Sequence, residues 1–242
     1  MRDYKKETAS RVAFIKEVLR DSGAKGIIYG NSGGKDSALV GILCKKACVD
    51  TVGVMMPCQS KRNFGEDMDD ACAVANQYGV ECRAIDLSEL KVLAVKLYGE
   101  YTELSEAAIA NIAPRLRMLT LYTLAASENR IVAGTGNRSE GYMGYFTKWG
   151  DGAFDFNPIA DLTVTEIYEF LEYLGAPENI RTKAPSAGLF EGQTDEKEMG
   201  VSYAAIDNYL LNGIADDKDL AIIERLHNRS EHKRCMPSIY GD

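Results

Sequence analysis

Apolar and polar residues follow two periods along this chain, one typical of amphipathic helices and the other of short buried strands. Val12, Ile15, Val18 and Leu19 share one face of a helix predicted over residues 3–19. Short apolar runs between polar or turn residues predict strands at 26–29, 51–56, 82–87 and 130–134. Helical spacing elsewhere predicts helices at 37–48, 66–78, 88–97, 102–127, 163–173, 201–211 and 217–226.

The alternation of strands and helices predicts an α/β fold. Parallel strands joined through helices make right-handed crossovers, so we expect a doubly wound, mostly parallel sheet with helices on both faces. Ligands in such sheets bind beyond the carboxyl ends of the strands, which places the loops at Gly30 and Gly134 on one rim. All 242 residues are predicted to form a single domain. The stretch 175–200 is rich in Gly, Pro, Ser and acidic residues, and we expect a mobile loop there.

The segment 30–37, Gly-Asn-Ser-Gly-Gly-Lys-Asp-Ser, stands between a predicted strand and a predicted helix. A strand that turns through glycines into a helix presents free backbone N–H groups and the positive end of the helix dipole to a phosphate. It is not a Walker A loop, because Asp36 follows Gly34-Lys35 where that pattern requires Ser or Thr. A carboxylate within a phosphate loop is explained by Mg²⁺, which bridges carboxylates to phosphates. The alternative is an ordinary glycine-rich turn that opens a helix.

The composition argues against several classes of partner and site. A formal net charge of −8 argues against a nucleic-acid partner held by bulk electrostatics. The chain has no run of 18 apolar residues and begins with a polar segment, so we expect no membrane partner, no signal peptide and a cytoplasmic location. The six cysteines form no C-x-x-C pair and the chain has only two histidines, which predicts reduced thiols and no zinc site.

Three further segments carry candidate chemistry. In 134–140, Thr135 offers a hydroxyl to a nucleotide and Glu140 a second carboxylate for Mg²⁺, although such a loop is also common without function. Lys148 lies in a glycine-rich aromatic segment, where a solvated lysine is the plainer interpretation. Arg115 and Arg117 begin a predicted helix and suit a carboxylate or phosphate, or are simply two surface charges.

Taken together, these segments resemble a known family. The loop 32–37, the segments 111–118, 134–140, 144–152, 185–187 and 192–196, and the tail 231–234 fall in the order found in ammonia-dependent NAD⁺ synthetases. The first motif is shared by several enzymes with an ATP pyrophosphatase loop. Thr-Lys-Trp-Gly-Asp-Gly at 147–152 and Gly-Gln-Thr-Asp-Glu at 192–196 are more specific to this family.

The resemblance implies a fold of the adenine nucleotide alpha hydrolase type and a set of binding residues. ATP is expected to contact Gly30, Asn31, Ser32, Gly33, Gly34, Lys35, Asp36, Ser37, Thr135 and Ser186. Deamido-NAD⁺ is expected to contact Arg115, Lys148, Asp155, His232 and Lys233. Asp36 and Glu140 are the expected Mg²⁺ ligands, and Asp36 and Lys148 are the expected catalytic residues. The resemblance also implies a homodimer and two mobile loops, at about 58–65 and 181–200.

The implied reaction is the amidation of deamido-NAD⁺ to NAD⁺. The nicotinate carboxylate attacks the α-phosphorus of ATP, pyrophosphate leaves, and ammonia displaces AMP from the acyl adenylate. Relatives that use glutamine carry a separate amidase domain, for which 242 residues leave no room, so free ammonia is the expected nitrogen donor. A separate glutaminase partner stays open.

One position departs from the family pattern. A lysine that contacts ATP often stands where this chain has Val164, and valine cannot bind phosphate. Either Lys35 or Lys183 supplies the charge, or ATP is held more weakly.

Three other functions remain as alternatives. A nucleotide sensor with a decayed site is the alternative that Val164 favours. A tRNA-thiolating or GMP-forming relative is disfavoured by the missing cysteine pair and the acidic charge, and a flavodoxin-like module by the missing G-x-G-x-x-G.

Overall fold

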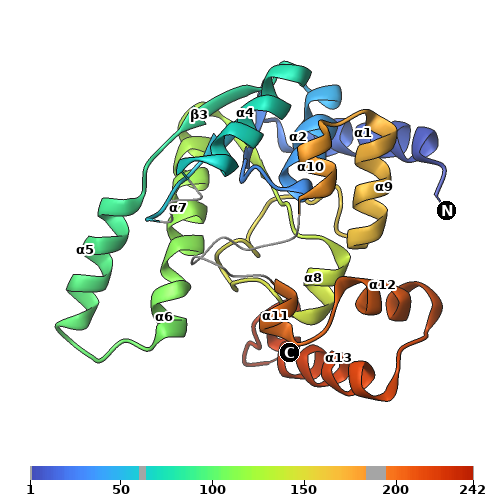
Figure 1. Ribbon diagram of the computed structural model, residues 1–242. Helices are drawn as coiled ribbons and strands as arrows, with labels where there is room; N and C mark the ends of the chain where they lie inside the picture. Colours follow the sequence, from blue (N-terminus) through green and yellow to red (C-terminus); the bar gives the residue numbers. More distant parts are fainter. Residues whose placement is uncertain (1, 60–63, 184–194, 242) are drawn as a thin grey trace.

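A four-stranded sheet lies at the centre of the computed structural model, which describes residues 2–59, 64–183 and 195–241 (Figure 1). The strands are β1 (Gly26–Gly30), β2 (Thr51–Met55), β3 (Glu81–Ala84) and β4 (Arg130–Ala133). They run in the order β3-β2-β1-β4, and every neighbouring pair is parallel. Ile28 of β1 stands opposite Val52 on one side and Val132 on the other. The predicted α/β class is therefore confirmed, and the sheet of named strands is wholly parallel.

Helices cover both faces of this sheet. Alternate residues of β1 point to opposite faces, so each set packs against the helices on its own side. Ile27 and Tyr29 belong to a core that also includes side chains from the helices on one face. Those helices are α1 (Tyr4–Ser22), α2 (Lys35–Ala47), α4 (Glu66–Tyr78), α9 (Val164–Leu174) and α10 (Glu178–Thr182). Ile28 packs on the opposite face with Leu121 and Ala125 of α7 (Ile112–Glu128). The central strand is thus buried on both sides, as its apolar sequence requires.

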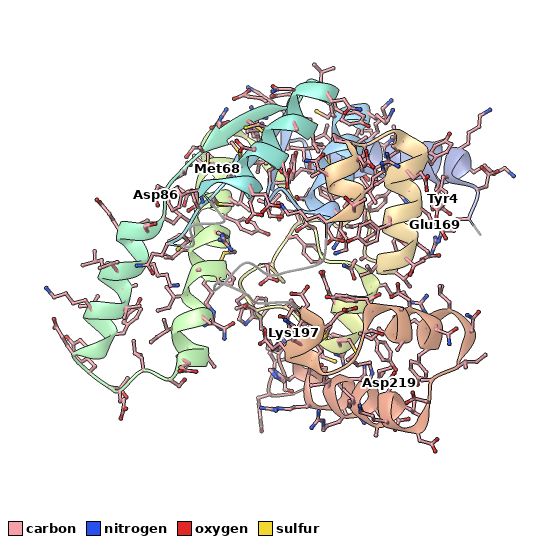
Figure 2. All side chains as sticks on the ribbon, viewed as in Figure 1. Tyr4, Met68, Asp86, Glu169, Lys197 and Asp219 are labelled. Carbon is pink, nitrogen blue, oxygen red and sulfur yellow. The ribbon has the colours of Figure 1, made fainter. Side chains whose placement is uncertain are left out.

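A helical limb projects from this body. It consists of α5 (Ser88–Gly99), α6 (Glu106–Ala110) and the first turns of α7 (Figure 1). In Figure 2, Asp86 marks the point where the limb leaves the body. The single helix predicted over 102–127 is wrong, since the chain breaks at Asn111 between α6 and α7. Pro114 explains the break, because proline has no N–H to continue the ladder from α6 and is tolerated in a first helical turn.

The C-terminal layer, as we call residues 195–234, packs against the short helix α8 (Arg138–Met143) and the start of α9. Its helices are α11 (Asp195–Met199), α12 (Tyr203–Asn212), α13 (Asp217–Arg229) and α14 (Glu231–Arg234). Ile206 and Ile223 are fully buried in its apolar core. Helices α10 and α11 occupy the two ends of the stretch 175–200, where we expected a mobile loop. The remaining part of that predicted loop, 184–194, lies outside the described residues, as do residues 60–63.

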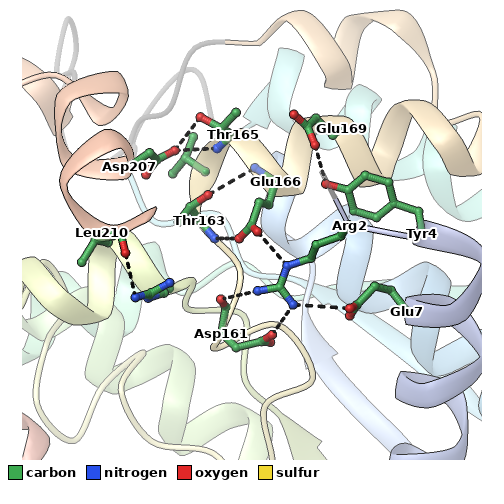
Figure 3. Close-up of polar contacts among 12 residues, drawn as sticks. Arg2, Tyr4, Glu7, Asp161, Thr163, Thr165, Glu166, Glu169, Asp207 and Leu210 are labelled. Atoms are coloured by element: carbon green, nitrogen blue, oxygen red, sulfur yellow. Dashed lines mark hydrogen bonds and ion pairs between the residues drawn. The ribbon is translucent and has the colours of Figure 1, made fainter. Parts of the chain in front are cut away.

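The beginning of α9 is fixed from the N-terminus of the chain (Figure 3). Thr163 and Glu166 form a capping box at the first turn of α9. Arg2 Nε donates to Glu166 Oε1 at 2.7 Å, and Arg2 Nη1 to Asp161 Oδ2 at 2.9 Å. Tyr4 donates its hydroxyl proton to Glu169 at 2.6 Å. These contacts make α9 a rigid support between the sheet and the C-terminal layer.

In residues 2–59, 64–183 and 195–241, none of the helices has the length and apolar character that crossing a bilayer requires.

Candidate active site

The phosphate loop, residues 30–37, joins the end of β1 to the start of α2. Gly33 adopts a positive φ of 72°, and a Cβ there would lie 2.0 Å from the Asp67 carbonyl oxygen, so only glycine fits. Ser37 Oγ lies 3.1 Å from Ser32 Oγ and donates to the Gly34 carbonyl at 3.0 Å. Because the N-cap residue of α2 is Gly34, no side chain caps the first N–H groups of this helix. An anion can therefore bind them.

A cavity of about 490 Å³ opens at the carboxyl ends of β1, β2 and β4, beside this loop. The predicted site residues that line it are 30–32, 34–37, Thr135, Glu140 and Lys233. Gly33 faces α4 instead. Arg115, Lys148, Asp155 and His232 are not among the lining residues, and Ser186 lies outside the described residues. The structure thus brings the expected phosphate and metal residues to one cavity and leaves most of the expected deamido-NAD⁺ residues outside it.

Asp36 and Glu140 face this cavity together and are linked through Asn137. The Asn137 side-chain amide donates to Asp36 Oδ1 at 3.1 Å, and the Asn137 backbone N–H donates to Glu140 Oε2 at 3.2 Å. In return, Asn137 Oδ1 accepts from the Glu140 backbone N–H at 2.9 Å, which completes a capping box on α8. Burial, and next the negative charge of Asp36, raise the pKa of Glu140 to about 8. Two carboxylates confined in this way favour a bound cation.

Lys35 is a buried cation beside these carboxylates. Its Nζ lies 2.6 Å from Asp36 Oδ2 and 5.8 Å from the centre of the Tyr203 ring. Burial acts to lower the pKa of Lys35, but the charges of Asp36 and Glu140 outweigh it and raise that pKa above its ordinary value. Lys35 is therefore charged at neutral pH and offsets part of the negative charge of the pair.

Lys183 reaches the same loop from the end of α10. Its Nζ donates to the Gly33 carbonyl at 3.3 Å, to Asp67 Oδ1 at 2.8 Å and to Asp70 Oδ2 at 2.5 Å. The side chain lines the cavity and is only 10% exposed. Lys183 thus ties the phosphate loop to α4, and both lysines considered as replacements for a base at position 164 lie at the cavity.

A rim cluster, formed by Arg115, Lys148 and His232, lies outside the cavity lining. Lys148 Nζ donates to the His232 carbonyl at 2.5 Å and stands over the Trp149 ring, 5.5 Å from its centre. Arg115 Nη2 donates to the Lys148 carbonyl at 3.5 Å. Three segments distant in sequence therefore meet at one place, with cationic side chains available to an anionic group.

Lys233 and Asp155 are held by contacts within the chain. Lys233 Nζ donates to the Gly144 and Phe146 carbonyls at 2.8 and 2.7 Å, which fixes the loop that carries Lys148. Asp155 Oδ2 accepts from the Val132 backbone N–H at 2.7 Å, and its Oδ1 accepts from the Tyr122 hydroxyl at 3.1 Å. Asp155 therefore supports the end of β4 in this structure.

Sequence reasoning missed several residues that line the cavity. Arg117 was a candidate beside Arg115 but was assigned no ligand: its Nε donates to the Met56 carbonyl at 3.1 Å, and burial lowers its pKa. Arg115 and Arg117 are two residues apart, and positions two apart in a helix do not share a face, so the helical period could have indicated that only one faces inward. Other lining residues outside the prediction are Asn111, Thr147, Asp151, Asp195 and Glu198. All of them except Glu198 lie in segments that carry the family resemblance, and that membership was the available signal.

Val164, the departure from the family pattern, is explained by packing. It is the first residue of α9, is 4% exposed and lies in the apolar core of the C-terminal layer beside Met199 and Val201. It does not line the cavity. A lysine at this position would lose its hydration to an apolar cluster.

The donor set at Asp36 and Glu140 fits Mg²⁺. Both are hard oxygen donors, and within the described ranges no group of three or more His, Cys, Asp or Glu side chains forms a complete metal cage. Mg²⁺ commonly takes one or two carboxylates and completes its shell with water and substrate phosphates. A phosphate bound at the start of α2 would supply those remaining oxygens.

The parallel sheet and the phosphate loop define an α/β protein that binds a nucleotide, with two carboxylates beside the loop. The sequence profile of the NAD synthase family matches residues 7–237. The ammonia-dependent NAD⁺ synthetase of Carboxydothermus hydrogenoformans is 46% identical over 240 residues, which cover 98% of each chain. The chain belongs to the NAD synthase family.

Solved structures agree with this membership. The NMN synthetase of Francisella tularensis covers all of both chains with 37% identity and a TM-score of 0.94. The ammonia-dependent NAD synthetase of Campylobacter jejuni covers 99% of both chains with 31% identity and a TM-score of 0.81.

Proposed function

We propose that this protein is a ligase that amidates deamido-NAD⁺ with ammonia and consumes ATP, giving NAD⁺, AMP and pyrophosphate. The observation that carries the proposal is the pair Asp36 and Glu140, joined through Asn137 beside an uncapped helix start, in a chain that matches NAD synthetases along its length. The same features support ATP as the nucleotide, because the cavity beside them receives phosphates from the α2 side.

The first step joins two anions, so the site must reduce their repulsion. The nicotinate carboxylate oxygen attacks the α-phosphorus, the bond to the bridging oxygen breaks, and pyrophosphate leaves with that electron pair. The N–H groups at the start of α2 and the ammonium of Lys35 bind the phosphates, and the walls of the cavity keep the partners in line. Asp36 and Glu140 would hold Mg²⁺, which would supply charge neutralisation for the pyrophosphate.

The second step needs no nucleophile from the protein. Ammonia attacks the acyl carbon of the adenylate, a proton is lost to solvent, and AMP leaves. The rim cluster is the proposed binding site for the remaining anionic part of deamido-NAD⁺, because Arg115 and Lys148 converge there. Lys148 is also the proposed stabiliser of the acyl phosphate, which requires its bond to the His232 carbonyl to open when substrate binds.

A turnover assay tests this function. Purified protein is mixed with ATP, MgCl₂ and deamido-NAD⁺, with either ammonium or glutamine, and NAD⁺, AMP and pyrophosphate are followed. Equal formation of all three products with ammonium, and little with glutamine, is expected. ATP binding without any NAD⁺ formation would overturn the proposal in favour of another amidated substrate or a decayed site.

A second candidate substrate is nicotinate mononucleotide, which would be amidated to NMN. It is favoured by the fold match to an NMN synthetase, whose TM-score of 0.94 exceeds the 0.81 of the Campylobacter NAD synthetase. The chemistry at the carboxylate is the same, and the two substrates differ by an adenylate moiety. We give priority to deamido-NAD⁺ because the relative with 46% identity is an NAD⁺ synthetase. The ratio of kcat/KM for the two substrates, measured under one condition, decides between them.

A homodimer formed through the helical limb is also part of the proposal. Leu90, Leu93 and Leu97 recur at helical spacing on α5, and each is 46–61% exposed. Leu119 on the neighbouring helix α7 is also exposed. A second copy of the chain, related by a two-fold axis, would bury this face against the same face. Light scattering should show a dimer, and Leu93→Glu should yield a monomer that keeps its fold.

We place the enzyme in the cytoplasm. All six cysteines are free in the structure, among them the exposed Cys235, as expected for a reducing compartment.

A further inference from the structure

Asp207 is a buried carboxylate in α12 with an unusual set of partners. It is 2% exposed and accepts hydrogen bonds from Ser139 Oγ at 2.5 Å, Thr165 N at 2.7 Å and Thr165 Oγ1 at 2.7 Å. No basic side chain of the described ranges forms an ion pair with it. Its charge is instead stabilised by two hydroxyls and by the N-terminal end of α9, where Thr165 is the second residue (Figure 3).

The two oxygens of this carboxylate serve different elements. Oδ1 bonds to Ser139 on α8, whereas Oδ2 bonds to Thr165 on α9. Ser139 Oγ also accepts from the Val164 backbone N–H at 3.3 Å. A residue of the C-terminal layer therefore fixes α8 relative to α9, and α9 is itself held by Arg2 and Glu166.

The bond to Ser139 bears on the cavity because the next residue is Glu140. Ser139 is fully buried, while Glu140 lines the cavity. Successive residues of an α-helix point about 100° apart, so the rotation of α8 about its axis decides the direction of Glu140. Helix α8 has six residues, and its far end is held by hydrogen bonds from His227, Ser230 and Arg234 to the Tyr142 and Met143 carbonyls, whereas Ser139 is fixed directly beside Glu140. A second bond to the same layer, from Arg138 Nη2 to the Leu210 carbonyl at 3.1 Å, acts in the same sense.

We propose that Asp207 is a positioning residue for Glu140 and acts on it through Ser139. The C-terminal layer then sets the geometry of a metal ligand without touching the metal. The inference rests on the proposed function in so far as Glu140 binds Mg²⁺. Outer partners of metal ligands typically change metal affinity by about 10- to 100-fold when they are lost, and that effect distinguishes positioning from general support.

The two arms of the carboxylate provide a matched pair of variants. Ser139→Ala removes the hydroxyl donor on α8, and Thr165→Val removes the hydroxyl donor on α9 with nearly unchanged shape. Each variant deletes one hydroxyl bond to Asp207. Ser139→Ala also removes the acceptor of the Val164 backbone N–H, and Thr165→Val keeps the backbone bond at position 165. Alanine is the best helix former, so Ser139→Ala is expected to fold. Melting temperatures of both variants check this.

The measurement is metal affinity, with two independent readouts. Binding of Mn²⁺ is followed by electron paramagnetic resonance in the presence of α,β-methylene-ATP, and the KM for Mg²⁺ is measured in turnover. Ser139→Ala should raise both constants about tenfold and speed amide exchange in α8, whereas Thr165→Val should stay within about twofold of wild type. Equal shifts in the two variants, or no shift in Ser139→Ala, would overturn the inference and leave Asp207 a structural residue.

Failure of the proposed function looks different. If wild type forms no NAD⁺, or if Glu140→Gln binds Mn²⁺ as tightly as wild type, the metal assignment itself is wrong. If both of those controls behave as proposed, but Ser139→Ala and Thr165→Val change the metal affinity equally, only the positioning role of Asp207 is wrong.

Discussion

The phosphate loop and the C-terminal layer reach the same cavity, but they are built in opposite ways. The loop is eight consecutive residues, and hydrogen bonds such as those of Ser32 and Ser37 join near neighbours in sequence, while Lys183 supports the loop from outside. The layer acts through side chains far apart in the chain, and Asp207 and Ser139 are separated by 68 positions. The phosphate loop therefore presents its donors from one continuous segment, whereas the direction of Glu140 depends on side chains of a distant one.

The largest effect is expected from a substitution in the phosphate loop, at Asp36. Asp36→Asn should lower kcat/KM by about a hundred- to a thousandfold, since the proposed metal ligand is weakened while a partner for Lys35 is kept. The melting temperature should change little. Asp36→Ala is the informative control, because it leaves the buried Lys35 without its carboxylate and should unfold at a lower temperature. Normal turnover in Asp36→Asn would remove Asp36 from the metal site.

Val164→Lys tests the layer side. The new ammonium would enter an apolar cluster with Met199 and Val201, so we expect a loss on the order of 3 kcal/mol in the free energy of unfolding. We expect no gain in ATP affinity, because position 164 does not line the cavity. Val164→Met, similar in length and uncharged, should cost much less. Tighter ATP binding at unchanged stability would contradict the packing explanation. Urea unfolding and ATP titration measure both quantities.

The rim cluster is the next, smaller test. Lys148→Ala should lower kcat/KM for deamido-NAD⁺ about ten- to a hundredfold, as expected for one charged hydrogen bond. Its melting temperature should stay close to that of wild type, since the side chain is partly exposed and its partners are a carbonyl and a ring. A large loss of stability with normal kinetics would make Lys148 structural.

A pH dependence of stability joins the two regions. Without metal, the pKa of Glu140 is raised in the folded protein to about 8 from an ordinary 4.5. The stability that this carboxyl contributes is thus present below about pH 4.5 and is lost as the pH rises through 8. In EDTA, Glu140→Gln should gain in melting temperature relative to wild type between pH 5 and pH 8. Parallel curves for the two proteins would show that Glu140 is not confined as described.

Much of the fold was predictable because its helices and strands follow from the local periodicity of apolar residues. The apolar run 26–29 and the glycine-rich segment behind it specify a buried strand and a phosphate loop without reference to the rest of the chain. The break at Asn111 was overlooked because the helical period continues across it and only Pro114 signals it. The short helix α8 escaped notice since its six residues are too few for a periodic signal.

The site was only partly predictable, for a related reason. Residues of the loop needed only their own sequence order. The inward position of Arg117 and the engagement of Asp155 by Val132 and Tyr122 depend on how α7 lies against β4, which no local pattern encodes. The burial of Val164 likewise follows from helices that come about 30 residues or more later in the chain.

The dual role of Asn137 makes the site vulnerable to chemical ageing. Its side-chain amide donates a hydrogen bond to Asp36, and its backbone N–H donates one to Glu140. Deamidation would exchange that amide for a carboxylate of nearly the same shape, and asparagine is among the residues prone to such damage. The amide donor of Asn137 would be replaced by a third carboxylate, beside those of Asp36 and Glu140. An aged sample would then keep its helices, whereas the carboxylates beside the phosphate loop would repel one another.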